Sequence, residues 1–176
     1  TCSDFCMRYY AIAFLSGAAV LTIEVMGARI LAPYLGTAYL VWVNIIGVIL
    51  AALALGYWAG GAAADRSARI LPLIFFVAAF FTSLIPIERE MLPTLSATLG
   101  IRLGSLAASL VLFGPASFAL GMVSPYLVKL ATKDIGSVGR SSGNIFAAST
   151  VGSIVGTFGT GFWLIPHFPA IRIIWG

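Results

Sequence analysis

Long uninterrupted runs of hydrophobic residues dominate this chain, and short segments that carry most of its polar residues separate them. A helix needs about 20 apolar residues to cross a bilayer, because its rise is about 1.5 Å per residue and the hydrocarbon is about 30 Å thick. Five runs meet this requirement, and a sixth begins near residue 170. The predicted helices cover residues 9–32, 40–62, 70–87, 103–123 and 143–165.

The apolar residues follow one another without the alternation of a strand, and lipid offers the backbone no hydrogen-bond partner, so each run favours a helix. The sequence therefore predicts an all-α fold, a polytopic membrane helix bundle of about six transmembrane helices. Residues 1–176 form a single transmembrane domain in this interpretation. We expect the first helix to end at Pro33, after a leader that contains Cys2 and Cys6. Pro115 removes one backbone hydrogen bond inside the run 103–123, so we expect a kink there.

Composition agrees with a lipid environment. Hydrophobic residues make up 60% of the chain and charged residues only 9%, with a mean hydropathy of +1.04. Soluble proteins contain about 25% charged residues. The net charge is +4, but the basic residues are scattered singly between apolar runs, which excludes a nucleic-acid interface.

The connecting segments predict the orientation. With the N-terminus inside, six basic residues lie on the cytosolic side, whereas only Arg89 and Arg102 lie opposite, beside Glu88 and Glu90. We therefore expect a multi-pass protein of the plasma (bacterial inner) membrane with a cytosolic N-terminus. The six inner residues are Arg8, Arg66, Arg69, Lys129, Lys133 and Arg140.

Two rows of small residues predict close helix contacts. Ala52, Gly56, Gly60 and Ala64 recur every four residues in the second predicted helix, and Gly152 and Gly156 do so in the fifth. Lipid provides no hydrophobic drive for helices to associate, so close backbone contact through small residues matters more. These rows favour packing within the chain, with a homodimer face as the alternative.

Glu24 lies inside the first apolar run, where a carboxylate costs about 2.5–3.5 kcal/mol. Arg29 follows five positions later, which places it poorly for direct pairing on the same helix, and it can extend to the interface. Asn44 on the second helix is a candidate neighbour. Together Glu24, Arg29 and Asn44 form a candidate intramembrane polar site, either a proton- or cation-coupled site or a structural polar tie.

Gly61, Asp65, Arg66 and Arg69 resemble the G-x-x-x-D-R-x-G-R motif in a cytosolic loop of major facilitator transporters. The second glycine of that motif is Ala68 here. The alternative interpretation is a basic turn that sets topology. Arginines at this place can satisfy free carbonyls at helix ends.

Chemical motifs are lacking. The chain has one histidine, His167, and no paired carboxylates that flank a cleft, so we predict no catalytic and no metal-binding residue. The glycine-rich residues 156–161 lie inside an apolar run where phosphate cannot reach, so we expect no cofactor in this chain.

Several short stretches of the chain belong together: FLSG at 14–17, EVMGARILAPYLG at 24–36, Trp42, LGY at 55–57, Asp65-Arg66, GMVSP at 121–125, VGR at 138–140, STVGSIVGT at 149–157 and FWLIP at 162–166. Together these stretches resemble membrane-embedded spermidine synthase-like proteins.

The resemblance implies a membrane domain related to half of a major facilitator transporter, followed by a cytosolic aminopropyltransferase domain that uses decarboxylated S-adenosylmethionine and putrescine. Such a soluble catalytic domain would lie after residue 176. This chain would then anchor or regulate it without being catalytic. The alternatives are a transporter-like half bundle that works as a dimer and moves a small solute or polyamine, and an accessory subunit of a larger membrane protein complex.

Overall fold

The computed structural model describes residues 2–66, 70–132, 136 and 138–169, with side chains from residue 7 onward, and its regular secondary structure in these ranges is entirely helical. The predicted all-α fold is confirmed for this part of the chain. The elements are α1 (Cys2–Leu35), α2 (Tyr39–Arg66), α3 (Leu71–Glu88), the 3₁₀ helix η1 (Arg89–Met91), α4 (Leu92–Leu112), α5 (Gly114–Gly121), α6 (Val123–Ala131), α7 (Val138–Phe158), the π-helix η3 (Gly159–Leu164) and α8 (Ile165–His167).

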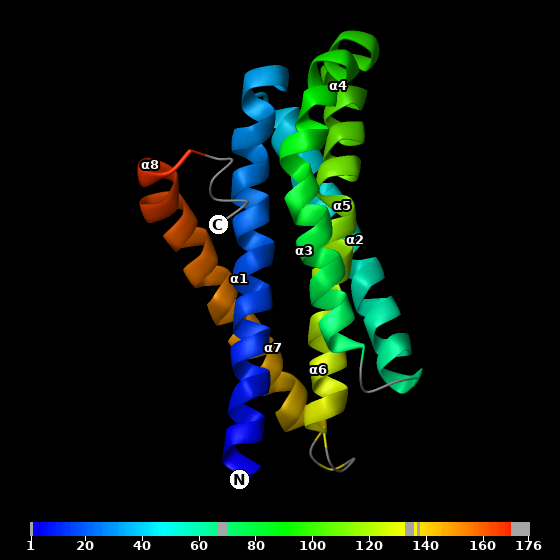
Figure 1. Ribbon diagram of the computed structural model, residues 1–176, viewed down its shortest axis with the longest axis vertical. Helices are drawn as coiled ribbons and strands as arrows, with labels where there is room; N and C mark the ends of the chain where they lie inside the picture. The colour runs from blue at the N-terminus through cyan, green and yellow to red at the C-terminus, as the bar shows by residue number, and fades with distance from the viewer. Residues whose placement is uncertain (1, 67–69, 133–135, 137, 170–176) are drawn as a thin grey trace.

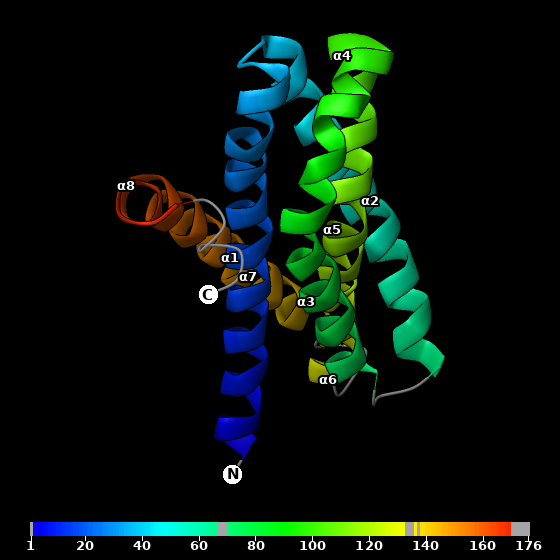
Figure 2. The same ribbon diagram turned by 45° about the horizontal axis from the view of Figure 1, so that its top comes forward.

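The long helices form an elongated bundle (Figure 1). Helix α1 runs the length of the bundle, and α2 returns beside α4, α5 and α6, which continue one another as a single column. Helix α3 packs against α5 of that column. Helix α7 crosses α1 obliquely and makes the most extensive helix contact of the described structure (Figure 2).

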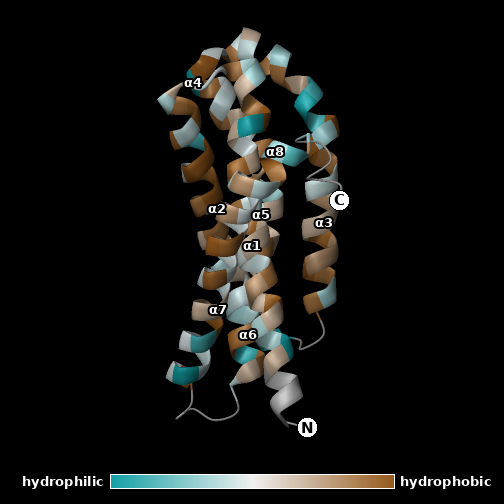
Figure 3. Ribbon diagram, turned by 90° about the vertical axis from the view of Figure 1, so that its left-hand side faces the viewer, coloured by the Kyte–Doolittle hydropathy of each residue, from teal (hydrophilic) through white to brown (hydrophobic). Residues whose placement is uncertain are grey.

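Four helical segments are long and apolar enough to cross a membrane: Met7–Leu35, Tyr39–Arg66, Leu71–Leu112 and Val138–His167. The third contains a sharp break at Gly100, whose φ is 68° and ψ is −178°. Large hydrophobic side chains face outward, with Trp58 77% and Phe162 76% exposed. Such a surface suits lipid and not water. Figure 3 shows hydrophobic residues along most of the helix lengths.

The first helix differs from its prediction at both ends. It already begins at Cys2, so Cys2 and Cys6 lie within the helix backbone, and it continues through Pro33 to Leu35. The stop is Gly36, which has a φ of 76° and whose N–H donates to the Ala32 carbonyl at 2.9 Å. Glycine adopts this left-handed conformation without steric cost, which makes it the usual residue just past a helix end.

The predicted helix 103–123 begins within three residues of the break at Gly100, which divides α4. It is too short at its other end, because the column continues through α5 and α6 to Ala131. The kink expected at Pro115 is confirmed, because α4 ends at Leu112 and α5 starts at Gly114. A second break at Met122 precedes Pro125, a proline for which the sequence prediction made no allowance.

The other predictions of helix bounds come closer. Residues 40–62 lie within α2, and 70–87 match α3 to one residue. The fifth run, 143–165, corresponds to α7 and η3, although α7 starts five residues earlier. The sixth helix, expected from residue 170, lies outside the described residues.

Buried hydrophobic side chains form two clusters. The larger one joins α1, α2, α3 and the α4–α5 column around residues such as Met26, Ile49 and Phe113. The smaller one surrounds Tyr126, Leu127 and Ile145. The hydroxyl of Tyr126 accepts a hydrogen bond from the Ile70 N–H at 3.0 Å, so it fixes the beginning of α3 to α6.

Candidate functional site

Glu24 lies in the middle of α1 and is partly buried. Among the described residues, no hydrogen bond or ion pair reaches its carboxylate. Arg29, five positions further along, is exposed near the end of α1 and makes no ion pair with Glu24. A carboxylate in this position lacks the partner that polar residues inside a membrane normally have.

Asn44 lies against α4 instead of Glu24. Its amide donates to the Arg102 carbonyl at 3.0 Å and to the Ser105 hydroxyl at 2.7 Å. Ser105 itself donates to the Ile101 carbonyl at 2.6 Å. The hydrogen bonds of Asn44 thus go to α4, and its expected grouping with Glu24 stays a prediction. Asn44 is a polar tie between α2 and the beginning of the second part of α4.

The loop motif lies at the end of α2. Asp65 forms an ion pair with Lys129 of α6, with 2.6 Å between the carboxylate Oδ1 and Nζ. Both side chains are exposed, and Arg66 is exposed as well. Gly61 faces open space, and Arg69 lies outside the described residues. The partner of the motif carboxylate is therefore a residue of α6 that the sequence interpretation did not connect with it.

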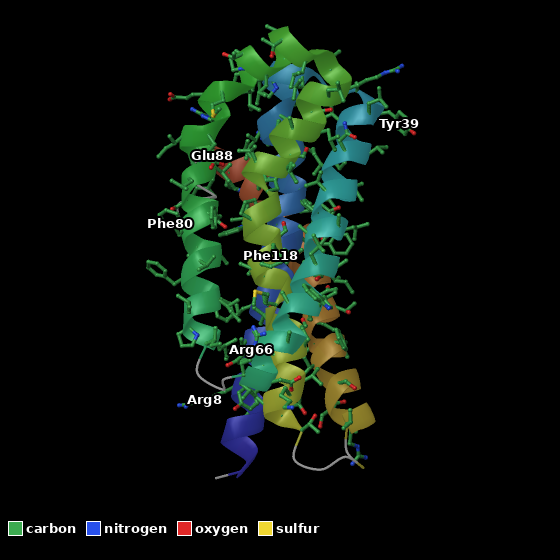
Figure 4. All side chains as sticks on the ribbon, turned by 90° about the vertical axis from the view of Figure 1, so that its right-hand side faces the viewer. Arg8, Tyr39, Arg66, Phe80, Glu88 and Phe118 are labelled. Carbon is green, nitrogen blue, oxygen red and sulfur yellow. The ribbon has the colours of Figure 1, made fainter. Side chains whose placement is uncertain are left out.

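Figure 4 places Arg8 and Arg66 toward one end of the bundle and Tyr39 at the opposite end. Lys129 lies at the first end as well, because it pairs with Asp65. Glu88 lies toward the end with Tyr39 (Figure 4). Arg8, Arg66 and Lys129, which the sequence assigned to the cytosolic side, therefore lie toward the same end of the bundle.

The small residues lie at helix contacts. A Cβ added to Gly56 or Gly60 would meet the backbone of Phe118 or Met122, at the α5–α6 junction. A Cβ on Gly152 or Gly156 would meet the backbone of α1. Ala52 is buried in the same row of α2, and Ala64 packs against the smaller hydrophobic cluster.

Two further glycines complete these contacts from the opposite side. Gly17 of α1 packs against Ser149 of α7, and Gly121 of α5 packs against Leu53 and Gly56 of α2. The sequence prediction did not include them, although Ala13 and Gly17, and likewise Ser117 and Gly121, show the four-residue spacing of small residues.

A column of buried serines was also missed. Ser105, Ser109, Ser117 and Ser124 are buried along α4, α5 and α6, at spacings of four, eight and seven residues. The hydroxyls of Ser109 and Ser117 are buried without a hydrogen-bond partner among the described residues. These spacings keep the serines near one side of a helix, so periodicity of hydroxyls in an apolar run was the available signal.

The described side chains contain no group of three or more His, Cys, Asp or Glu residues that could hold a metal ion. No protein-family model, curated protein or solved structure matches this chain. Within the ranges that the structure covers, the site consists of an unpaired intramembrane carboxylate, buried hydroxyls and glycine contacts, in a helix bundle with the length and apolarity of a membrane protein.

Proposed function

We propose that this chain is the membrane-embedded domain of a spermidine synthase-like protein. It anchors or regulates a cytosolic aminopropyltransferase domain and is not catalytic by itself. Its N-terminus lies in the cytosol. The observation that carries this proposal is that the stretches with the resemblance contact one another across helix pairs.

These contacts join stretches far apart in the sequence. Phe14 and Gly17, of the first stretch, lie against Gly152 and Ser149. Gly56, in the stretch at 55–57, lies against Gly121, in the stretch at 121–125. Residues that contact one another in this way belong to one packed unit. This supports the interpretation that the resemblance concerns a whole membrane domain and not isolated short motifs.

The path of the chain supports a half-transporter arrangement. Counting α3 and the α4–α6 column as separate passes gives five crossings: α1, α2, α3, α4–α6 and α7–α8. A sixth crossing from about residue 170 would complete a six-helix, major-facilitator-half-like bundle. It would also deliver the following residues to the same side as the N-terminus, where Arg8, Arg66 and Lys129 gather.

The intact mass of the native protein, extracted from membranes, tests this proposal. We expect a mass well above the 18.5 kDa of this chain, with the excess accounted for by a transferase domain. Residues 1–176 expressed alone should transfer no aminopropyl group from decarboxylated S-adenosylmethionine to putrescine. A native chain of 18.5 kDa, or turnover by the isolated bundle, would contradict the proposal.

A second candidate is a transporter-like half bundle that moves a small solute or polyamine, and the unpaired Glu24 favours it. Ionisable residues inside membrane-spanning helices mark ion and proton pathways in transporters. Uptake of labelled putrescine into proteoliposomes should fall in Glu24→Gln and persist in the control Glu90→Gln, which alters an exposed residue. Equal uptake by wild type and Glu24→Gln would reject this candidate.

A further inference from the structure

A small cavity lies where α1, α2, α7 and the α5–α6 junction meet. Its volume is about 80 Å³. Hydroxyl groups from several of these helical segments line it, and its described lining contains no basic side chain. The lining residues are Ser16, Gly17, Val20, Leu21, Leu53, Tyr57, Leu120, Ser124, Ser149 and Ser153.

The cavity lies at the centre of the membrane-spanning segments. Leu21 is the central residue of Met7–Leu35, Leu53 is at the centre of Tyr39–Arg66, and Ser153 is at the centre of Val138–His167. A polar cavity at this depth is surrounded by hydrocarbon on the outside of the bundle. Substrate and ion sites of transporters typically lie near this midplane.

Its polar atoms are oxygens with spare acceptor capacity. Ser16 donates to the Ala13 carbonyl at 2.9 Å and Ser153 to the Gly17 carbonyl at 3.1 Å, which leaves their lone pairs free. Ser124 is 5% exposed and Ser149 is partly buried. Four serine oxygens thus line one cavity, so this lining favours an occupant that can be bound by several oxygens.

The break between α5 and α6 adds another acceptor beside the cavity. Pro125 has no N–H, so the Gly121 carbonyl loses the donor that a continuous helix would supply four residues later. Gly121 lies between the lining residues Leu120 and Ser124. Carbonyls released by interrupted helices coordinate cations in many transporters.

Glu24 is the nearest acidic residue of α1 to the cavity along the chain. It follows the lining residues Val20 and Leu21 by one helical turn and does not itself line the cavity. Spacings of three and four residues place it on the same face of α1 as Val20 and Leu21. One carboxylate next to several neutral oxygens matches the charge of a single monovalent cation.

We propose that this cavity binds one small monovalent cation, either Na⁺ or a primary ammonium group, with serine oxygens as ligands and Glu24 as counter-charge. A water molecule occupies about 30 Å³ in the liquid, so the cavity has room for the cation and one or two waters. Binding does not depend on the spermidine synthase-like proposal. The proposed site names the class of ligand for the transport candidate. Only the movement of that ligand across the membrane rests on the transport candidate.

Thermal unfolding of the whole chain in detergent tests the site, in a buffer free of sodium and primary amines. At constant ionic strength, NaCl or methylammonium chloride should raise the midpoint temperature in a saturable way. Choline chloride should not, because its quaternary nitrogen has no N–H and is too large for the cavity. The cation that raises the midpoint temperature at the lower concentration is the one that the site prefers.

Variants then assign the ligands. Glu24→Gln and Ser124→Ala should weaken the apparent affinity by at least about tenfold, as expected for the loss of an interaction with a charged group. Glu90→Gln and Ser96→Ala, which alter an exposed and a partly buried residue outside the cavity lining, should leave it unchanged. If a variant fails to fold, equilibrium dialysis of wild type with labelled Na⁺ or methylammonium, and of Ser149→Ala, provides the same comparison.

Absence of saturable binding of both cations, or an equal response to choline, would overturn the site. An unchanged affinity in both Glu24→Gln and Ser124→Ala would do the same. Saturable binding without putrescine uptake would leave the site in place and reject only the transport candidate. Failure of the site and failure of the proposed function are thus separate results.

Discussion

Helix α1 has two contrasting faces. Toward α7, Gly17, Gly152 and Gly156 bring the two backbones into direct contact, and the Thr160 hydroxyl donates to Thr22 at 3.0 Å. Toward α3, the same helix borders a cavity of about 1000 Å³. Large apolar side chains such as Met26 line this cavity without filling it.

The contrast shows what holds helices together where lipid is the solvent. Apolar side chains gain little by leaving lipid for another helix, because both surroundings are equally apolar. Close approach of backbones gains van der Waals contact that lipid cannot provide. Glycines, and not bulky hydrophobic residues, therefore decide which face of α1 packs directly against another helix.

The largest expected effect is loss of the closed face. Gly152→Leu places a side chain where the backbone of Phe14 lies, so α7 must move away from α1. We expect the free energy of unfolding to fall by about 3 kcal/mol or more, at the upper end of overpacking effects. Titration with sodium dodecyl sulfate from mixed micelles, followed by circular dichroism, measures it.

Gly143→Leu is the matched control, because Gly143 lies on the same helix and a Cβ there would meet nothing within 4 Å. It should unfold like the wild type. If both variants lose stability equally, a general effect of leucine on α7 and not contact with α1 is the cause. If neither does, the glycine contact does not hold this face together.

A smaller effect is expected where side-chain hydrogen bonds join helices. Asn44→Ala removes the two hydrogen bonds that the Asn44 amide of α2 donates to α4, to the Arg102 carbonyl and the Ser105 hydroxyl. Interhelical hydrogen bonds in membranes contribute about 0.6 kcal/mol on average, so we expect a loss of about 1–2 kcal/mol. The same titration measures it.

Asn144→Ala serves as the control for that variant, since this exposed side chain makes one longer hydrogen bond of 3.3 Å, to the Tyr10 hydroxyl. Its unfolding should change less than that of Asn44→Ala. A loss in Asn44→Ala as large as in Gly152→Leu would show that polar ties match glycine contacts in this bundle.

The exposed end of the bundle should respond still less. Asp65→Asn breaks the ion pair with Lys129, whose charged groups are 2.6 Å apart but exposed. Exposed pairs contribute about 0.2–1 kcal/mol, so we expect a loss of about 0.5 kcal/mol that vanishes at high salt. Unfolding at low and at high NaCl concentration checks this, and a loss that persists at high salt would indicate a structural role for Asp65.

Much of the fold followed from the sequence, because apolar runs of sufficient length have few alternatives in lipid. The rows containing Gly56 and Gly152 also indicated contact faces through their four-residue spacing alone. Their partners could not be read, because Gly17 and Gly121 are single glycines whose role depends on what lies opposite. Helix ends were missed where backbone conformation decides them, as at Gly36 and Gly100.

The polar site was predicted only in part for the same reason. Glu24 stands out in an apolar run, but the sequence does not show which helix faces it. Asn44 was named as its candidate neighbour, whereas the Asn44 amide donates to the Ser105 hydroxyl of α4. The small cavity combines residues from α1, α2, α5, α6 and α7, so only the tertiary arrangement reveals it.

The smallest expected effect sharpens the comparison of the two faces. Ala19 lies on α1 two residues after Gly17, but it borders the large cavity. Ala19→Leu adds apolar volume where space exists, so we expect the free energy of unfolding to change by less than about 0.5 kcal/mol. Gly17→Leu, which directs the same side chain against Ser149, should unfold far more easily. If both variants lose the same free energy of unfolding, the α3 side of α1 is also tightly packed in the membrane. The contrast between the two faces of α1 would then disappear.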